Sequence, residues 1–215
     1  MRKKAVVFDL DGTLINSLPD IAAAMNKALT AHGLPTHEER AYRLFTGDGA
    51  MNLTLRALGN RHDMAEQILA AYAGEYGANS HVNTAPYPGI AELLGSLVGK
   101  GLRLCVLSNK DEKDVQQVIA HYFPGNVFDI VRGRQEGVPL KPDPTALLKI
   151  AAQLCLAPQD FWYVGDTWTD MLCAANAGME SIAVIWGFQT REEIAGGAPA
   201  HYADSTGELL KILLS

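Results

Sequence analysis

Two carboxylates one residue apart follow directly after a short run of strand-forming residues near the start of the chain. Asp9 and Asp11 end the apolar run 5–8, and Gly12 and Thr13 come next. A short apolar run bounded by glycine predicts a buried parallel strand. In an open α/β sheet, ligands bind just beyond the carboxyl ends of the strands. Because carboxylates there are costly to desolvate unless a cation or a reaction uses them, the pair predicts a metal site or an aspartyl nucleophile.

A second pair of acids follows a later predicted strand. Asp166 and Asp170 are four residues apart, so one helical turn can direct both carboxylates to one place. Together with Asp9 and Asp11 they would crowd negative charge at the strand tips, which a cation must offset. Oxygen ligands of this kind predict a hard divalent ion, and Mg²⁺ suits a site that also holds waters and a substrate phosphate. A calcium EF-hand is excluded, because its glycine and closing glutamate are not at the required positions.

Two other segments offer groups that could hold a phosphate. Ser108 supplies a hydroxyl, and the backbone of Asn109 and Lys110 leads into a predicted helix at Asp111. This arrangement suits a phosphate cradle and equally a helix N-cap. Lys141 precedes another predicted helix, where it is either a partner for a phosphate or carboxylate or a solvated surface lysine.

The composition limits the function classes. The chain has 215 residues, 48% of them hydrophobic and 20% charged, which is typical of a soluble globular protein. A net charge of −6 disfavours a nucleic-acid partner but not a small phosphorylated substrate, since a metal ion supplies local positive charge. No run approaches the roughly 20 apolar residues of a membrane span. Three cysteines without a CxxC pair indicate buried thiols in a reducing compartment. We therefore expect a cytoplasmic protein with no membrane partner.

The elements that must position these residues follow two patterns. From residue 85 onward, predicted strands alternate with predicted helices, which indicates a parallel sheet covered on both faces. The strands are expected at 102–107, 127–131, 161–164 and 182–185, with helices centred near residues 95, 117, 149, 173 and 209.

Residues 16–84 show helical spacing instead, including a capping-box spacing at Thr36 and Glu39. The sequence thus predicts a core of 1–15 and 85–215 with an all-helical insertion at 16–84. Because the insertion leaves the sheet beside Asp11, we expect a lid over the site; a packed accessory domain is the alternative.

Four segments, in this order, resemble the motifs of the haloacid dehalogenase superfamily of phosphotransferases. They are Asp9-x-Asp11-Gly12-Thr13, Ser108-Asn109, Lys141-Pro142 and Gly165-Asp166-x-x-x-Asp170. The resemblance spans nearly the whole chain. It implies an α/β fold with a Rossmann-like parallel sheet and an inserted helical cap, hinged near residues 14–18 and 83–88.

The resemblance also implies roles for the matched residues. Asp9 would be the nucleophile that forms an aspartyl-phosphate, and Asp11 the general acid and then the general base. The Asp9 carboxylate, the Asp11 backbone carbonyl and Asp166 would hold Mg²⁺. Lys141 would balance charge on Asp9 and the phosphoryl group, and Asp170 would hold Lys141 or a metal-bound water.

The remaining matched groups would bind substrate or support the site. Ser108 and the backbone N–H groups of Gly12 and Asn109 would bind the phosphoryl oxygens, with Thr13 behind them. Because dehalogenases of the superfamily lack an acid at the position of Asp11, that reaction is disfavoured.

Within the superfamily, the nearest resemblance is to phosphoglycolate phosphatases and their pyrophosphatase-like relatives. The cues include the run 11–17, the cap motif 46–49 and the segment 175–178. The expected enzyme is then a phosphoglycolate phosphatase acting as a monomer or homodimer. Arg43, Asp48 and Lys110 are candidates for contacting the leaving group, although Arg43 equally fits a solvated helix face. A pyrophosphatase, a sugar phosphatase, a phosphomutase and a non-catalytic phospho-ligand binding protein stay open as alternatives.

Overall fold

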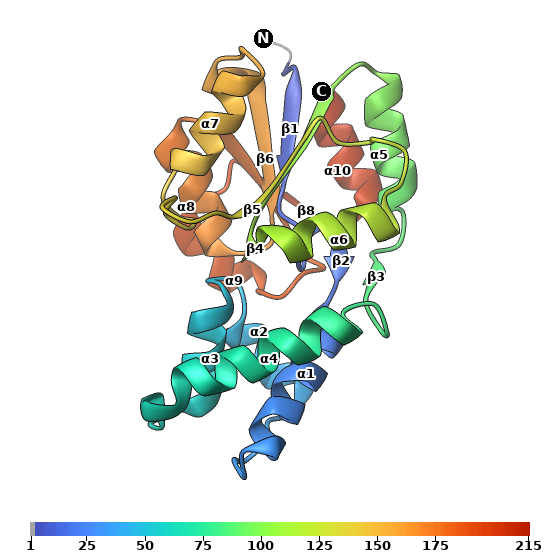
Figure 1. Cartoon of the computed structure of the whole chain (residues 1–215). Helices are drawn as coiled ribbons and strands as arrows, with labels where there is room; N and C mark the ends of the chain where they lie inside the picture. Colours follow the sequence, from blue (N-terminus) through green and yellow to red (C-terminus); the bar gives the residue numbers. More distant parts are fainter. Residues whose placement is uncertain (1–2) are drawn as a thin grey trace.

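The computed structural model describes residues 3–215 and contains one six-stranded sheet whose neighbouring strands are all parallel. The strand order is β5-β4-β1-β6-β7-β8, which places the first strand in the interior (Figure 1). The strands are β1 (Ala5–Phe8), β4 (Arg103–Asp111), β5 (Ile130–Arg134), β6 (Phe161–Gly165), β7 (Glu180–Val184) and β8 (His201–Ala203). The predicted α/β fold with a parallel sheet is confirmed.

Helices cover both faces of this sheet, as the sequence pattern predicted. The side chains of β1 are all buried and alternate between two apolar clusters, because successive residues of a strand point to opposite faces. Val6 and Phe8 pack with one helical layer, whereas Ala5 and Val7 pack with the other. The first layer contains α5 (Ile90–Gly99), α6 (Glu112–Tyr122) and α10 (Thr206–Leu214), and the second contains α7 (Thr145–Gln153) and α8 (Trp168–Ala177).

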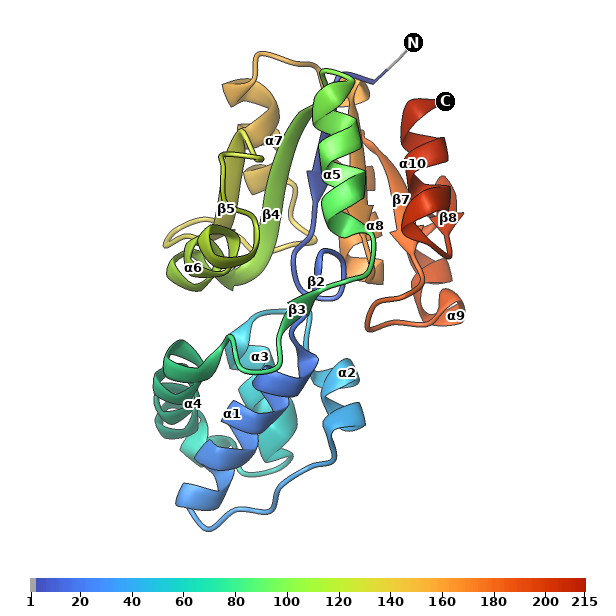
Figure 2. The ribbon, with the colours of Figure 1, turned by 90° about the vertical axis from the view of Figure 1, so that its right-hand side faces the viewer.

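A separate group of helices lies beyond the carboxyl ends of the strands (Figures 1 and 2). It has its own apolar cluster, which includes Met25, Tyr42 and Ile68. Its elements are α1 (Leu18–Ala31), α2 (Tyr42–Phe45), α3 (Ala50–Leu58) and α4 (Ala65–Asn79), with the 3-10 turns η1 (Glu39–Ala41) and η2 (His62–Met64). We call this group the helical segment.

Two short strands connect the helical segment to the sheet. β2 (Ile15–Asn16) and β3 (Ala85–Pro86) form an antiparallel pair (Figure 2). Beside them, the buried carboxylate of Asp20 accepts hydrogen bonds from the backbone N–H groups of Asn83 and Thr84 and from the Thr84 hydroxyl. The two segments where the chain passes between the sheet and the helical segment, which we call the β2–β3 crossings, are therefore joined by backbone pairing and by the Asp20 carboxylate.

Several local expectations differ from the structure. β4 continues to Asp111 and so includes Ser108 and Lys110, which the sequence placed in a turn; its pairing with β5 is irregular after Leu107. β5 begins three residues later than predicted, and the short edge strand β8 was missed because three residues give no clear periodicity.

The helical segment and the thiols bring further corrections. The capping box at Thr36 does not form, because η1 begins after Glu38 and has no side-chain cap. Cys155 is exposed, unlike the other two cysteines. Among residues 3–215, no helix combines the length and apolar character that a membrane crossing requires.

Between residues 3 and 215 the chain also has one short helix and two further 3-10 turns. α9 (Arg191–Ile194) and the 3-10 turns η3 (Pro158–Asp160) and η4 (Ala195–Gly197) complete the described chain. α9 begins with a capping box in which Thr190 and Glu193 bond each other's backbone N–H groups. α9 lies on the side of the sheet that faces the helical segment (Figure 1), and its Glu193 pairs with Arg43 of that segment.

Candidate active site

The carboxyl ends of β1, β4 and β6 bring together the polar residues that the sequence singled out. Asp9 follows β1 and donates its backbone N–H to Val164 of β6 at 2.9 Å. Ser108 and Asn109 lie near the end of β4, and Asp166 follows β6. All four side chains are buried. Parallel neighbours end at one edge of the sheet, so residues that are far apart in sequence meet there.

Three carboxylates form the centre of the site. Asp9, Asp166 and Asp170 each offer an oxygen atom within 4.8 Å of the others. Burial raises the pKa of Asp9 to about 7, despite the nearby ammonium of Lys141. Burial, followed by the charges of Asp9 and Asp170, raises the pKa of Asp166 well above its ordinary value. The protein thus holds negative charge together at a cost that a bound cation would offset.

Lys141 lies inside this cluster. Its Nζ is 2.9 Å from Oδ1 of Asp9 and 2.7 Å from Oδ1 of Asp170. Although burial alone would lower the pKa of Lys141, the charges of Asp170 and Asp9 raise it above its ordinary range. The lysine therefore stays charged. Its backbone is held as well, because Lys141 N–H donates to Oδ1 of Asn109 at 2.9 Å while Asn109 Nδ2 donates to Lys141 O at 3.2 Å.

Asp170 has its hydrogen-bonding capacity filled by protein groups. Oδ1 accepts from Lys141 Nζ and from the Tyr163 hydroxyl, and Oδ2 accepts from the backbone N–H and the hydroxyl of Thr167. A carboxylate with all these donors around it has little left for a metal. Its position is that of a residue that holds Lys141.

Asp9 and Asp166 keep free acceptor capacity and fit a divalent cation. Among residues 3–215, the group paired with Oδ1 of Asp9 is the ammonium of Lys141, at 2.9 Å, which leaves the carboxylate lone pairs for a cation. Asp166 accepts one hydrogen bond at each oxygen, from the Thr13 hydroxyl and from Phe188 N–H, both at 2.8 Å. Each oxygen retains a lone pair, and hard oxygen donors of this kind suit Mg²⁺.

Glycines make room for Asp166. Gly12 adopts φ +86°, in the left-handed region, and a Cβ there would overlap the Asp166 carboxylate. A Cβ on Gly187 would meet the same side chain. Only glycine both adopts this positive φ readily and leaves room for the Asp166 carboxylate. These two requirements explain why the first motif has glycine at position 12.

Asp11 faces away from this cluster and is held by two other side chains. Lys110 Nζ donates to both of its oxygens, at 2.6 and 2.7 Å, and the Ser17 hydroxyl donates to Oδ1 at 2.5 Å. Ser17 was not identified from the sequence, because a serine just ahead of a helix is most simply a cap. In the structure, Ser17 makes no side-chain cap.

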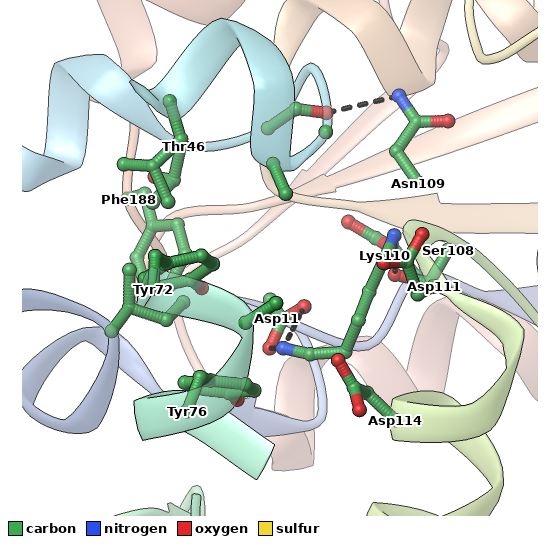
Figure 3. A pocket seen from close by; sticks show the side chains of 17 residues that line it. Asp11, Thr46, Tyr72, Tyr76, Ser108, Asn109, Lys110, Asp111, Asp114 and Phe188 are labelled. Atoms are coloured by element: carbon green, nitrogen blue, oxygen red, sulfur yellow. Dashed lines mark hydrogen bonds and ion pairs between the residues drawn. The ribbon is translucent and has the colours of Figure 1, made fainter. Parts of the chain in front are cut away.

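A cavity of about 670 Å³, including space open to solvent, lies between the strand ends and the helical segment (Figure 3). Its polar floor is formed by residues predicted from the motifs: Asp9, Asp11, Ser108, Asn109 and Lys110. Its other wall comes mainly from the helical segment, which supplies Ile21, Thr46, Leu53, Tyr72 and Tyr76. The two tyrosines were not identified from the sequence, where aromatic residues at helical spacing indicate a core.

The other candidates are placed differently. Gly12, Thr13, Lys141, Asp166 and Asp170 lie behind the cavity floor, where they hold its lining residues.

The structure does not bring Arg43 into the cavity. Its guanidinium Nη2 is 3.0 Å from Oε2 of Glu193, across the boundary between the helical segment and the sheet domain. Asp48 accepts from Thr169 Oγ1 at 3.2 Å and pairs with Arg56, so it too is engaged by protein groups.

The parallel sheet and the carboxylates at its strand ends are features that a known family of hydrolases shares. The model of the haloacid dehalogenase-like hydrolases matches residues 6–184, and the chain belongs to this family. The predicted resemblance is confirmed.

The relatives extend the assignment. The chain is 35% identical to a phosphoglycolate phosphatase of Pseudomonas putida over 96% of its length and 78% of that protein. It is 34% identical to a phosphoglycolate phosphatase of Vibrio vulnificus, covering 98% and 96% of the two chains. The prediction of a phosphatase of this superfamily is confirmed.

Solved structures agree in fold. A putative phosphoglycolate phosphatase from Lactobacillus delbrueckii superposes with a TM-score of 0.94 at 27% identity, covering all of both chains. A predicted phosphoglycolate phosphatase from Haemophilus somnus gives a TM-score of 0.92 at 30% identity, covering 99% and 98% of the chains.

Proposed function

We propose that this chain is a Mg²⁺-dependent phosphomonoesterase that acts on phosphoglycolate through an aspartyl-phosphate intermediate. The observation that carries the proposal is Asp9, a buried carboxylate at the cavity floor whose Oδ1 lies 2.9 Å from Nζ of Lys141. The names of the relatives support the substrate.

The first proposed step begins at Asp9. An oxygen of Asp9 attacks the phosphorus atom, and the bond from phosphorus to the ester oxygen breaks. Asp11, in its protonated form, gives its proton to the departing alkoxide. Ser108 and the backbone N–H of Asn109 hold the phosphoryl oxygens, while the charge of Lys141 offsets charge on Asp9 and the phosphoryl group. The N–H of Gly12, expected from the sequence to share this role, donates to Ile15 O at 2.9 Å instead. Phosphoryl transfer requires mainly such positioning and neutralisation.

The second step releases phosphate. Asp11, now a carboxylate, takes a proton from a water molecule that attacks the phosphorus of the Asp9 acyl phosphate, and the bond between phosphorus and the Asp9 oxygen breaks. Both carboxylates return to their starting states. The Asp9 and Asp166 carboxylates and the Asp11 backbone carbonyl would hold Mg²⁺, which would neutralise phosphoryl charge when bound.

In this proposal the helical segment, residues 16–84, is a cap that closes over the cavity and hinges at the β2–β3 crossings. The wall that the helical segment supplies to the cavity supports a role in substrate selection. A cytoplasmic location and a monomeric or homodimeric state stay predictions.

Phosphate release tests the proposal. Purified protein is assayed with Mg²⁺ on phosphoglycolate, sugar phosphates and pyrophosphate, with Asp9→Asn as the blank and Asp204→Asn, an exposed surface acid, as the matched control. We expect release that requires Mg²⁺ and Asp9 and is greatest on phosphoglycolate.

Other outcomes decide between the alternatives. Activity led by a sugar phosphate or by pyrophosphate would keep the chemistry and discard the substrate. Appearance of an isomeric sugar phosphate without free phosphate would indicate a phosphomutase. No turnover of any compound would indicate a phospho-ligand binding protein.

A further inference from the structure

One corner of the cavity carries two donors that the two-step chemistry does not use. Lys110 and Tyr76 both line the cavity, one from β4 and the other from α4 (Figure 3). The Nζ of Lys110 lies 4.7 Å from the centroid of the Tyr76 ring. The sheet domain and the helical segment therefore each supply one side chain to this corner.

The hydroxyl of Tyr76 has no partner. The side chain is 2% exposed, and its oxygen forms no hydrogen bond with any residue of the described chain, 3–215. Leaving a buried hydroxyl unpaired is unfavourable, because it loses its hydrogen bond to water and gains none. A ligand in the cavity that accepts this O–H would recover that free energy, so the hydroxyl marks a binding position.

The charges of the cavity define what that ligand is. The acidic side chains among the lining residues are Asp9, Asp11, Asp111 and Asp114, whereas the described lining contains one ammonium group, that of Lys110. A phosphoryl group would be neutralised at Asp9 by Lys141 and a divalent cation. A second anionic group on the same substrate has only Lys110 to pair with, and elsewhere it would meet carboxylates.

The bonding of Lys110 leaves room for such a group. An ammonium carries three N–H bonds. Two of them go to the oxygens of Asp11, and the ammonium otherwise faces the ring of Tyr76. A carboxylate could accept the third N–H of Lys110 and the O–H of Tyr76 without displacing Asp11.

We propose that Lys110 and Tyr76 form the subsite for the carboxylate of the leaving group when the substrate is the phosphate ester of a short 2-hydroxy acid, such as phosphoglycolate. This inference rests on the proposed phosphomonoesterase function and names the residues that bind the carboxylate of its substrate. In such an ester, a single carbon separates the carboxylate from the ester oxygen. Holding the carboxylate on Lys110 therefore brings the ester oxygen toward Asp11, the other partner of Lys110 and the proposed acid.

A matched pair of substrates isolates the carboxylate. Phosphoglycolate and its primary amide have nearly the same shape, but only the first carries the negative charge of a carboxylate. The readout is the ratio of kcat/KM for the acid to kcat/KM for the amide. For the wild-type protein we expect a ratio of about 100, as for loss of charge-assisted hydrogen bonds.

Substitutions in the subsite should collapse this ratio. We expect Lys110→Met to bring it near one and Tyr76→Phe to lower it about tenfold. Lys110→Arg, which keeps the charge, should retain part of the preference. Tyr72→Phe is the matched control, since Tyr72 stacks on Tyr76 at 5.6 Å and lines the same wall; its ratio should stay unchanged.

A purely structural role gives a different result. If Lys110 only positions Asp11, Lys110→Met will lower kcat/KM for both substrates equally and leave the ratio unchanged, which would overturn the inference. An unchanged ratio in Tyr76→Phe would overturn it as well. Because Lys110 is buried, circular dichroism and Tm are used to check that each variant is folded. If Lys110→Met does not fold, Tyr76→Phe still tests the subsite.

The controls separate this inference from the proposed function. A wild-type enzyme that prefers neutral esters overturns the subsite but keeps the phosphatase. Faster turnover of phospholactate than of phosphoglycolate, with an acid-to-amide ratio that still collapses in both variants, supports the subsite and discards the substrate. Titration calorimetry of phosphoglycolate in the Asp9→Asn background gives a readout without turnover: weaker binding on adding Tyr76→Phe or Lys110→Met supports the subsite, and equal binding overturns it.

Discussion

Lys141 donates a hydrogen bond of 2.7 Å from Nζ to Oδ1 of Asp170, and both side chains are almost fully buried. The bond fixes an ammonium beside Asp9 that could not remain charged in this interior without partners. Asp170 also accepts from Tyr163 and Thr167, so four donors converge on one carboxylate. It is the anchor of the site rather than a reacting group.

Asp170→Asn should therefore destabilise the protein and lower its activity. The amide group would turn an N–H₂ toward existing donors and leave Lys141 with less compensating charge. We expect the free energy of unfolding to fall by about 3 kcal/mol, measured by urea denaturation, together with a lower kcat. Asp204→Asn, at the exposed Arg191 pair, should cost less than about 1 kcal/mol. Equal losses in the two variants would contradict the anchoring role.

The stability of the metal-free protein should fall as the pH rises from about 4 to 7. Burial raises the pKa of Asp9 from 3.8 to about 7, so the folded protein binds protons more tightly than the unfolded chain in this range. Stability is then fully present below the unfolded pKa and is lost as pH rises through the folded one. The pKa of Asp166 is raised in the same direction.

Tm measured in EDTA and in Mg²⁺ across this range checks the sign. Because Mg²⁺ competes with protons for the same oxygens, it should raise Tm more at pH 8 than at pH 5. Asp166→Asn should weaken this response. Hydrogen bonds from Thr84 and Asn83, working against burial, hold the pKa of Asp20 below its usual value, and this contribution is lost only at lower pH. A Mg²⁺ shift that is the same at both pH values would count against the metal site.

Gly12→Ala should be far more damaging than Gly33→Ala. Both glycines have positive φ, +86° and +68°, but a Cβ at position 12 would overlap Asp166, whereas position 33 has nothing within 4 Å. We expect about 1 kcal/mol for Gly33→Ala, the cost of the left-handed backbone, and about 3 kcal/mol with loss of turnover for Gly12→Ala. Denaturant titrations of the two variants give the comparison. Equal costs would mean that conformation alone explains Gly12.

Arg43→Ala should change substrate affinity more than stability. Its ion pair with Glu193 joins the helical segment to the sheet domain, and both side chains are about one-third exposed. A pair this exposed is worth less than about 1 kcal/mol, so Tm should hardly change, while KM should rise by up to about fivefold if the contact favours the closed arrangement. Arg40→Ala is the control, since Arg40 pairs with Glu38 within the helical segment. An identical KM in both variants would exclude this role for Arg43.

Local sequence patterns predicted most of the fold. The run 5–8 is a strand because four apolar, strand-forming residues precede a glycine turn, and it is central because it is buried on both faces. β8 was missed because three edge residues give no period. β4 continues through Ser108 to Asp111 because strand pairing, which is a tertiary contact, extended it past the predicted turn.

The candidate site divides in the same way. Asp9 and Asp166 could be identified because each is a costly carboxylate placed directly after a predicted strand. Lys141 was assigned a role only through its motif, because a lysine before a helix fits a solvated surface as well. Ser17 and Tyr76 could not be identified, because a serine before a helix and a tyrosine at helical spacing have ordinary structural explanations. Only the folded arrangement shows Ser17 bonded to Asp11 and the Tyr76 hydroxyl without a partner.

By itself, the sequence determined which residue types lie at the strand ends and in what order they occur, since periodicity and spacing are local properties of the chain. The tertiary structure decided which of them touch. In the folded protein Lys110 pairs with Asp11, Arg43 forms an ion pair with Glu193 outside the cavity, and Tyr76 lies opposite the strand ends. These contacts join residues tens to hundreds of positions apart, and their partners are chosen by packing between the helical segment and the sheet, which no local pattern encodes.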